Sequence, residues 1–303
     1  MKIIDHTDST ILDTIGRTPL LCVNGFAPEV SDKIKIYAKL ECFNPGGSVK
    51  DRAAYQMIID AEESGELTKN KIIIDSTSGN TGIAYAMISA VKGYRAKIVI
   101  PHNASIERKK IIAGFGAEIV YSSPFEGSDG AIKLAREIYE NDPDTYFMPD
   151  QYGNPSNWKA HYLGTGPEII EQTKGKVTHF IACLGTTGTI TGTGKALKEY
   201  NADIKIYAVE PDDAMHGIEG LKHMDSSIVP AIYDRSFPDQ TLYINTDEAY
   251  DMVKRITVCG GLPIGHSCGA AMVGALEVAK TMDEGLIVAI FPDGGDRYLS
   301  HEI

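Results

Sequence analysis

The chain has 303 residues, enough for two domains, and its 43% hydrophobic and 23% charged residues are typical of a globular protein. A net charge of -12 and an isoelectric point near 5.1 argue against nucleic acid or an anionic membrane as the main partner, because both require basic surface. No segment has the pattern of a signal peptide or a membrane span, which predicts a cytoplasmic protein. The five cysteines show no C-x-x-C spacing, so neither a disulfide framework nor a metal site is indicated.

Short β-branched runs alternate along the chain with stretches of helical spacing. Strands are predicted at 34–40, 71–75, 97–100, 117–121, 179–183, 204–210 and 286–291, and helical patterns such as 81–93 and 128–142 lie between them. This alternation is typical of parallel sheets covered by helices on both faces, so we expect an α/β fold. The loop-rich segment 150–157 separates two such series and is the predicted domain junction. Ligands of open parallel sheets bind beyond the carboxyl ends of the strands, so the turns that follow the strands should carry the chemistry.

The turn after the first predicted strand reads ECFNPGGSVKDR, residues 41–52. Ser48 and Asp51 have the spacing of a capping box, which predicts a helix capped by Ser48 with Lys50 at its second position. The positive end of the helix dipole, together with burial, would lower the pKa of Lys50 and favour a neutral, nucleophilic amine. The alternative is an ordinary solvated lysine beside charged neighbours.

Two further strand-to-helix turns have the composition of anion sites. The sequence STSGNTG at 76–82 offers hydroxyls, an amide and a helix start, which suits a carboxylate. The sequence LGTTGT at 184–189 places glycines and threonines before the next helix, which suits a phosphate. No G-K-[ST] follows, and the later G-T-G lacks the third glycine of a dinucleotide fingerprint, so neither of those motifs applies. Plain helix caps are the alternative at both turns.

A third turn, GHSCG at 265–269, matches the nucleophile elbow of α/β-hydrolases and supports a rival hypothesis with Ser267 as nucleophile. That fold needs an acid and then a histidine after the serine, and the remaining chain offers Asp293, Asp296 and His301. Ser267 could instead be a neutral hydrogen-bond partner at a helix start.

Together, a lysine amine, a phosphate cradle, hydroxyl and amide donors and a neutral serine describe the surroundings of pyridoxal 5′-phosphate. The segments IGRTPL (15–20), NPGGSVKDR, TSGNTGI, GTTGT and FPDGGDRYLS resemble, in order, motifs of the cysteine synthase family (O-acetylserine or O-phosphoserine sulfhydrylase) of fold-type II pyridoxal-phosphate enzymes. The resemblance covers essentially the whole chain. It implies a homodimer whose chains have two domains, each a mostly parallel twisted sheet covered by helices. The smaller mobile domain would span 44–155, and the larger one 1–43 and 156–303.

The resemblance also implies roles for individual residues. Lys50 would bind the cofactor covalently and later move the α-proton, Asn80 would bind the ring oxygen, and Ser267 would face the pyridine nitrogen. The cofactor phosphate would be held by Gly185, Thr186, Thr187, Gly188 and Thr189. The substrate α-carboxylate would be bound by Thr77, Ser78, Thr81 and Gln151.

The implied reaction is β-replacement through an aminoacrylate, giving cysteine from O-phosphoserine or O-acetylserine and sulfide. The segment 216–234 looks closer to the O-phosphoserine type, in which a basic residue aligns with Lys222 and could receive the phosphate. Lys222 could equally be a solvated loop residue.

One departure from the family pattern leaves a second reaction open. Asp75-Ser76 stands where the family usually has Glu-Pro. Ser76 could help to place a water, which would add to the aminoacrylate formed from cysteine with Asp234 or another carboxylate as the base. That reaction would yield serine and hydrogen sulfide. A binding protein on the same fold is the non-enzyme alternative, and the presence of Lys50 with the other cofactor residues argues against it.

Overall fold

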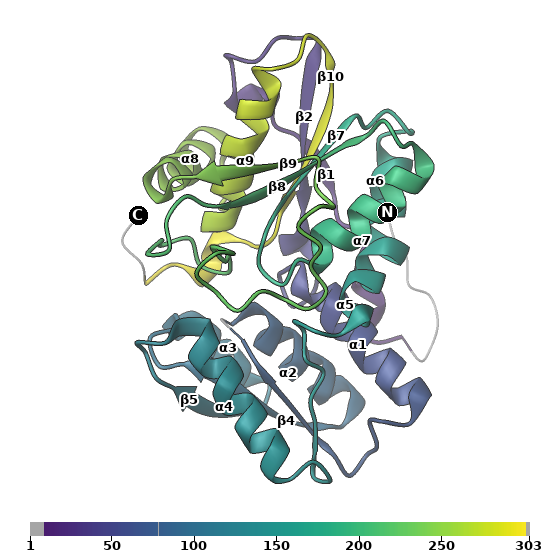
Figure 1. Cartoon of the computed structure of the whole chain (residues 1–303), viewed down its shortest axis with the longest axis vertical. Helices are drawn as coiled ribbons and strands as arrows, with labels where there is room; N and C mark the ends of the chain where they lie inside the picture. Colours follow the sequence, from purple (N-terminus) through teal and green to yellow (C-terminus); the bar gives the residue numbers. More distant parts are fainter. Residues whose placement is uncertain (1–8, 78, 301–303) are drawn as a thin grey trace.

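The chain forms two open sheets with helices on both faces of each (Figure 1). The computed structural model describes residues 9–77 and 79–300. Ser78 and His301, both singled out from the sequence, lie outside the described residues. None of the helices in the described ranges has the length and apolar character needed to cross a membrane. The two sheets confirm the α/β fold expected from the alternation of strands and helices.

The smaller sheet has four parallel strands in the order β5-β4-β3-β6. Its strands are β3 (Ile72–Ser76), β4 (Arg95–Pro101), β5 (Glu118–Ser122) and β6 (Tyr146–Phe147). The helices of this half are α1 (Lys50–Ser64), α2 (Asn80–Lys92), α3 (Ile106–Gly114) and α4 (Gly127–Asn141). A helix follows each of β3, β4 and β5, because parallel neighbours need a crossover connection.

The larger sheet has six strands in the order β1-β2-β10-β7-β8-β9, in which β1 runs antiparallel to β2 and the other neighbours are parallel. Its strands are β1 (Leu20–Cys22), β2 (Ile34–Leu40), β7 (His179–Cys183), β8 (Lys205–Pro211), β9 (Gln240–Ile244) and β10 (Gly285–Phe291). Packed around it are α5 (Pro155–Ala160), α6 (Gly166–Gln172), α7 (Gly188–Tyr200), α8 (Thr246–Gly260) and α9 (His266–Ala279). Short helical turns are η1 (Ile11–Thr14), η2 (Asn24–Phe26), η3 (Glu41–Phe43), η4 (His161–Thr165) and η5 (Gly295–Arg297).

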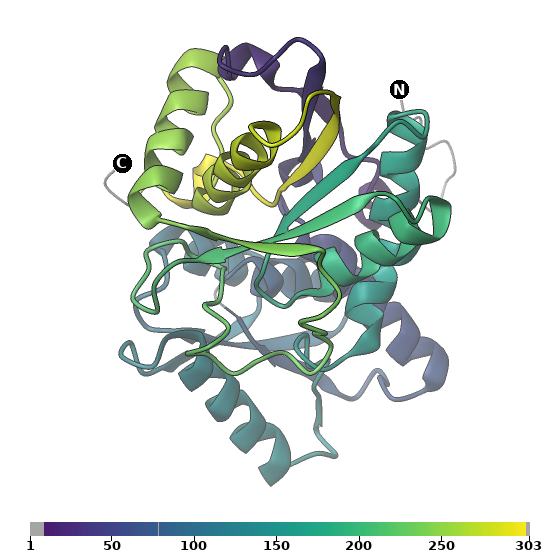
Figure 2. The ribbon, with the colours of Figure 1, turned by 45° about the horizontal axis from the view of Figure 1, so that its top comes forward.

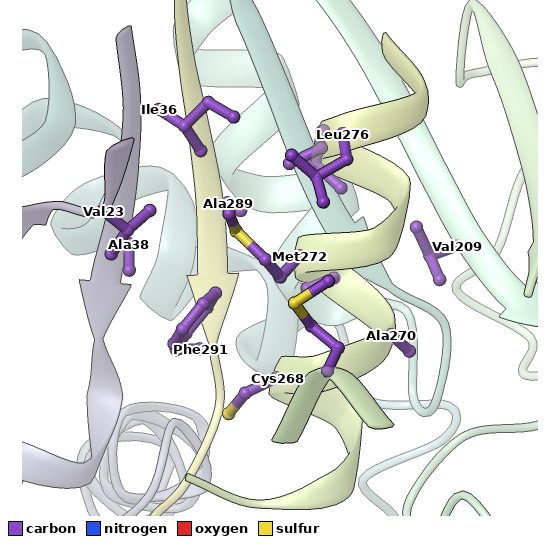
Figure 3. Close-up of a cluster of buried hydrophobic side chains, with 14 of the residues drawn as sticks. Val23, Ile36, Ala38, Val209, Cys268, Ala270, Met272, Leu276, Ala289 and Phe291 are labelled. Atoms are coloured by element: carbon purple, nitrogen blue, oxygen red, sulfur yellow. The ribbon is translucent and has the colours of Figure 1, made fainter. Parts of the chain in front are cut away.

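Helix α9 is buried along most of its length against the six-stranded sheet. Figure 3 shows Cys268 and Met272 of this helix beside Ala289 and Phe291 of β10, and all four side chains belong to one buried apolar cluster. Close packing of such a cluster leaves little freedom to the backbone that carries it. The same packing therefore fixes Ser267, which immediately precedes Cys268 at the start of α9.

The structure contains all seven predicted strands, each with ends within two residues of the prediction. Strands β1 and β6 were not predicted because, at three and two residues, they are too short to show a period. The domain boundaries 44–155 against 1–43 and 156–303 remain a proposal. It is supported by the chain ranges of the sheets, since the four strands of the smaller one lie within 72–147 and those of the larger one within 20–40 and 179–291.

Candidate active site

Two adjoining cavities lie between the two sheets, beyond the carboxyl ends of β2, β3, β7 and β10. Both are partly enclosed by the protein and partly open to solvent. Both cavities are lined by Lys50, Asn80, Gly185, Thr186, Gly220 and Leu221. The first also contacts Ser267, Thr187 and Thr189, and the second contacts Thr77, Thr81, Gln151 and Lys222. The turns that follow the strands thus meet at one place, as the rule for open parallel sheets predicts.

Lys50 is the first residue of α1, so the predicted cap is wrong by one position: Val49 occupies the N-cap. The Ser48 hydroxyl accepts a hydrogen bond from the Lys50 amide at 3.3 Å, whereas Asp51 reaches back across the turn to accept one from the Gly46 amide at 2.6 Å. Pro-Gly-Gly therefore folds back onto the helix start, which a linear capping box does not anticipate.

Burial lowers the pKa of Lys50 below its usual range, although the nearby carboxylate of Asp293 acts in the opposite direction. Within the described ranges, no hydrogen bond or ion pair occupies its Nζ atom, which faces the cavity. A lowered pKa favours the neutral form of this amine, which is the form that attacks a carbonyl carbon.

The turn between β7 and α7 has an unusual backbone conformation and is tightly packed. Thr187 has a φ of 69°, a conformation that costs energy for a side chain branched at Cβ, and it serves as the N-cap of α7. A Cβ atom at Gly185 would overlap the carbonyl oxygen of Gly220, and one at Gly188 would overlap Oδ1 of Asn157. The two glycines therefore let the chain pack closely against Gly220 and Asn157, while Thr187 and Thr189 at the start of α7 line the first cavity.

A second row of side chains behind this corner holds its hydroxyls. Nδ2 of Asn157 donates to Oγ1 of Thr186 at 3.1 Å, and Nε2 of His161 lies 3.3 Å from Oγ1 of Thr189. Burial lowers the pKa of His161 to about 3, with the positive charge of Arg52 acting in the same direction, so the imidazole is neutral. Both residues come from the α5–η4 segment, which the sequence analysis did not single out.

The start of α2 forms the second corner. Oγ1 of Thr77 accepts a hydrogen bond from the Gly79 amide at 2.8 Å, and the Thr81 hydroxyl donates to Oε1 of Gln151 at 2.7 Å. Nε2 of Gln151 donates in turn to the Ser76 carbonyl at 2.6 Å. Three of the four predicted carboxylate ligands thus lie together at one end of the second cavity, and the fourth, Ser78, is outside the described residues.

Asp75 and Ser76 are buried at the end of β3 but do not line either cavity. Burial raises the pKa of Asp75 to about 7, although hydrogen bonds from the Ser76 amide and from the Tyr85 hydroxyl oppose that rise. Asp234 is exposed, accepts hydrogen bonds from the amide and hydroxyl of Ser236, and is not among the cavity residues.

Asn80 is held in one orientation by two residues from the C-terminal segment. Its Nδ2 donates to Oδ2 of Asp293 at 2.7 Å, and its Oδ1 accepts from Arg297 at 2.6 Å. A carboxylate can only accept and a guanidinium can only donate, so the amide has a single assignment. Arg297 also donates to the carbonyl of Gly46, in the turn before Lys50. The FPDGGDRYLS motif contained both residues, but only the fold shows what they contact.

Ser267 lies in the first turn of α9 and faces the first cavity. The α/β-hydrolase hypothesis is wrong, because the residues before it form a loop after α8 and no strand of the described chain ends there. A nucleophile elbow needs a strand-to-helix turn.

Two ion pairs connect the loop that follows β8 to the smaller half of the molecule, and Figure 2 shows this loop in green against the blue half. Arg108 of α3 pairs with Glu219, and Lys222 pairs with Asp129 of α4 at 2.8 Å. Arg108 and Asp129 were not recognised from the sequence, since nothing in their local pattern distinguishes them from surface charges.

Comparison with known proteins identifies the family. The sequence model of the family described as "Pyridoxal-phosphate dependent enzyme" matches residues 11–293. A cysteine synthase from Aquifex aeolicus is 48% identical over 296 residues, which cover 96% of this chain and 90% of that protein. The chain belongs to the cysteine synthase family of pyridoxal-phosphate dependent enzymes.

Solved structures agree with this assignment and with the fold-type II architecture. A cysteine synthase from Entamoeba histolytica superposes with a TM-score of 0.91 at 37% identity, covering 99% of this chain and 93% of that one. A hydrogen sulfide-producing enzyme from Fusobacterium nucleatum superposes with a TM-score of 0.89 at 38% identity, covering 96% of this chain and 99% of that one.

The residues of this family member fit pyridoxal phosphate. The start of α7, a helix N-terminus of the kind that suits a phosphate, lies at this cavity, and its first turn brings the hydroxyls of Thr187 and Thr189 there. Lys50 and Ser267 line the same cavity. The protein is thus a pyridoxal-phosphate dependent enzyme, and the first cavity brings together residues that could hold this cofactor.

Proposed function

We propose that the protein catalyses β-replacement on a serine- or cysteine-type amino acid and that its product is cysteine, made from O-acetylserine or O-phosphoserine and sulfide. The observation that carries the proposal is the convergence on one place of a buried amine, Lys50, with an anion corner at α7 and a second at α2. The name of the Aquifex aeolicus relative, cysteine synthase, supports the same reaction.

Four parts of the chain would hold the cofactor. The phosphate would lie against Gly185 to Thr189, Asn80 would bind the ring oxygen, and Lys50 would bind the carbonyl carbon. When bound, pyridoxal phosphate supplies an electron sink that lets the Cα–H bond and then the bond to the β-substituent break. Ser267, as a neutral partner, would not enforce a protonated ring nitrogen. A weaker electron sink favours prompt loss of the β-substituent over transamination.

The substrate would be held by its α-carboxylate at the start of α2. Thr77, Thr81 and Gln151 supply hydroxyl and amide groups there, and the resemblance adds Ser78. Once the substrate's own amine displaces that of Lys50, the freed lysine would take the proton from Cα. Closure of the smaller domain, 44–155, would exclude water while the sulfur nucleophile adds.

The test is a set of three titrations of the purified holoenzyme with O-acetylserine, O-phosphoserine and L-cysteine, followed by cofactor absorbance. We expect an absorbance change with one or both serine esters that sulfide reverses as cysteine forms. The Lys50→Ala variant should lose turnover by at least about a thousandfold, and Lys92→Ala, a surface lysine on α2, should not. An unmodified spectrum with all three amino acids would refute the proposal.

A second reaction, cysteine plus water giving serine and hydrogen sulfide, is favoured by the Asp75–Ser76 pair and by the similarity to a hydrogen sulfide-producing enzyme. In this proposal Ser76, which lies behind the cavity wall, would place the water through Gln151, whose amide donates to its carbonyl, and Asp234, which lies outside both cavities, or another carboxylate would be the base. Replacing Asp75 and Ser76 together by Glu and Pro should then reduce sulfide release from cysteine, and so should Asp234→Asn. Unchanged sulfide release in both variants would eliminate these roles.

A homodimer in the cytoplasm completes the proposal. The acidic composition and the family resemblance support it. Light scattering of the purified protein should give twice the chain mass of 32.9 kDa, and cell fractionation should recover the enzyme with the soluble contents.

A further inference from the structure

Lys222 lines the cavity that contains the substrate corner, and its positive charge is already paired with a carboxylate. Its side chain is only 4% exposed, and its Nζ lies 2.8 Å from Oδ1 of Asp129. The other oxygen of Asp129 accepts a hydrogen bond from the Ile228 amide at 3.1 Å, so the carboxylate is held on both sides. The ring of Tyr152 lies 5.3 Å from the same Nζ. Lys222 therefore has a fixed partner and a defined position, unlike a solvated loop lysine.

This ion pair lies at the wall between the second cavity and an outer groove. Lys222 lines the second cavity together with Lys50, Thr77 and Gln151. Lys222 and Asp129 also line a wider groove that leads outward from that cavity. An amino acid whose carboxylate is bound at Thr77, with its Cα near Lys50, would share this cavity with Lys222, so that its β-substituent would lie in the field of the ion pair.

The remaining charges of the wall do not favour a second anion. Arg108 is paired with Glu219 and lies 3.8 Å from Asp293. In the described part of the chain, the acids that line the cavities and the groove are Glu126, Asp129, Glu219 and Asp293. Apart from Lys50, the cations there are Arg108 and Lys222. Since acids outnumber these cations, the field at the mouth opposes a dianion.

We propose that Asp129 determines substrate specificity: by occupying Lys222, it excludes a phosphate as the β-substituent and selects an uncharged one, such as an ester or a thiol. The inference rests on the proposed function and narrows it. A phosphate dianion would have to draw Lys222 away from Asp129 and would then lie beside an uncompensated carboxylate. Placing like charges together in a desolvated site is a recognised way to reject the wrong ligand.

The test is a comparison of binding constants that requires no turnover. One ligand is the phosphonate analogue of O-phosphoserine, in which a CH2 group replaces the ester oxygen, and the other is L-methionine, which is uncharged beyond Cα. Each is titrated into holoenzyme at pH 8, where the phosphonate is dianionic, and the cofactor absorbance gives Kd. For the wild type, we expect the phosphonate to bind at least about tenfold more weakly than methionine.

The variants assign this ratio to Asp129. Asp129→Asn keeps an acceptor for the Ile228 amide and frees Lys222, so the ratio should shift toward the phosphonate by about tenfold. Adding Lys222→Gln should abolish that gain. Asp251→Asn, the same loss of charge at an exposed position on α8, should leave the ratio within about twofold. Asp129→Ser serves as the second variant if circular dichroism shows that Asp129→Asn does not fold.

Two results would overturn the inference: a wild-type enzyme that binds the phosphonate as tightly as methionine, or a ratio that is unchanged in both Asp129 variants. Failure of the proposed function looks different. If none of the three substrate amino acids reacts, β-replacement is refuted, while the ratio of binding constants still decides whether Asp129 excludes the anion.

Discussion

Replacing Arg52 by methionine should destabilise the fold strongly. This arginine, two residues after Lys50, forms ion pairs with two carboxylates. Its Nε and NH2 bond both oxygens of Glu41 at 2.7 and 3.0 Å, and its NH1 and NH2 bond both oxygens of Glu168 at 2.7 and 2.8 Å. The side chains of Arg52 and Glu41 are 4% and 0% exposed. The cluster thus ties the start of α1 to the end of β2 and to α6.

The expected cost follows from the burial of Glu41. Removing one partner of a buried ion pair leaves an uncompensated charge and typically costs about 3–5 kcal/mol. Glu41 keeps hydrogen bonds from Thr18 at 2.7 Å and from Asn44 at 2.8 Å, which limits the loss to that range. Because a folded protein is stable by only about 5–15 kcal/mol, the variant should lose a large part of its stability.

Urea unfolding of the wild type and Arg52→Met, followed by circular dichroism at a fixed cofactor concentration, measures the difference. The control is Lys92→Met, which removes the ion pair of Lys92 with Glu62. These side chains are 21% and 24% exposed, so the loss should be less than about 1 kcal/mol.

Burial opposes ionisation of Glu168, yet its hydrogen bond with Arg52 and the charges of Arg52 and Lys39 lower the pKa of Glu168 to about 2. The wild type therefore keeps this contribution above the unfolded pKa and loses it as the pH falls toward 2.

In the variant the carboxylates of Glu41 and Glu168 protonate at higher pH, which removes the cost of burying their charge. The difference in unfolding free energy between wild type and variant should therefore become smaller between pH 7 and pH 3. A loss below about 1 kcal/mol at pH 7, or a gap that does not change with pH, would refute the reasoning.

Three further predictions concern the cofactor pocket and the end of β3. Gly188→Ala should weaken cofactor binding by about tenfold or more when the apoenzyme is reconstituted, since its Cβ would overlap a side-chain oxygen of α5. The control Gly114→Ala has open space around it and should bind the cofactor normally. Equal cofactor affinities of the two variants would contradict the crowding argument. Asp293→Asn should release Asn80 from its single orientation, so that both the cofactor Kd and the wavelength of its absorbance band change; an unaltered band would show that the carboxylate does not position this amide. Asp75 has a pKa raised by burial to about 7, so its contribution is greatest at low pH and is lost as the pH rises through 7. The wild type should therefore lose up to about 4 kcal/mol relative to Asp75→Asn between pH 4 and pH 8 in urea unfolding, and parallel curves would refute the shift.

The local pattern of the chain was sufficient to predict most strands and to point to the strand-to-helix turns that line the cavities. β-branched runs and helical spacing located the seven predicted strands, because these signals depend on neighbours within a few residues. The turns at 76–82 and 184–189 were recognised for the same reason, since glycines and hydroxyl residues at a strand-to-helix junction act on the backbone beside them. Lys50 was singled out in the same way, although its helix begins one residue later than its cap pattern indicated.

The fold alone decided which charges face one another. Arg297 and Asp293 orient Asn80 from more than two hundred positions away, with sequence separations of 217 and 213 residues. Asp129 accepts a hydrogen bond from Lys222, 93 residues further along the chain. The sequence allowed Lys222 to be a phosphate-binding residue, whereas the fold places it in an ion pair. No periodicity or motif encodes such pairs, because an isolated Asp or Arg in a helix has the same local pattern whether it faces water or a buried partner. In our proposal substrate choice depends on the pair of Asp129 with Lys222, because the charge at the mouth of the cavity is set only after the chain has folded.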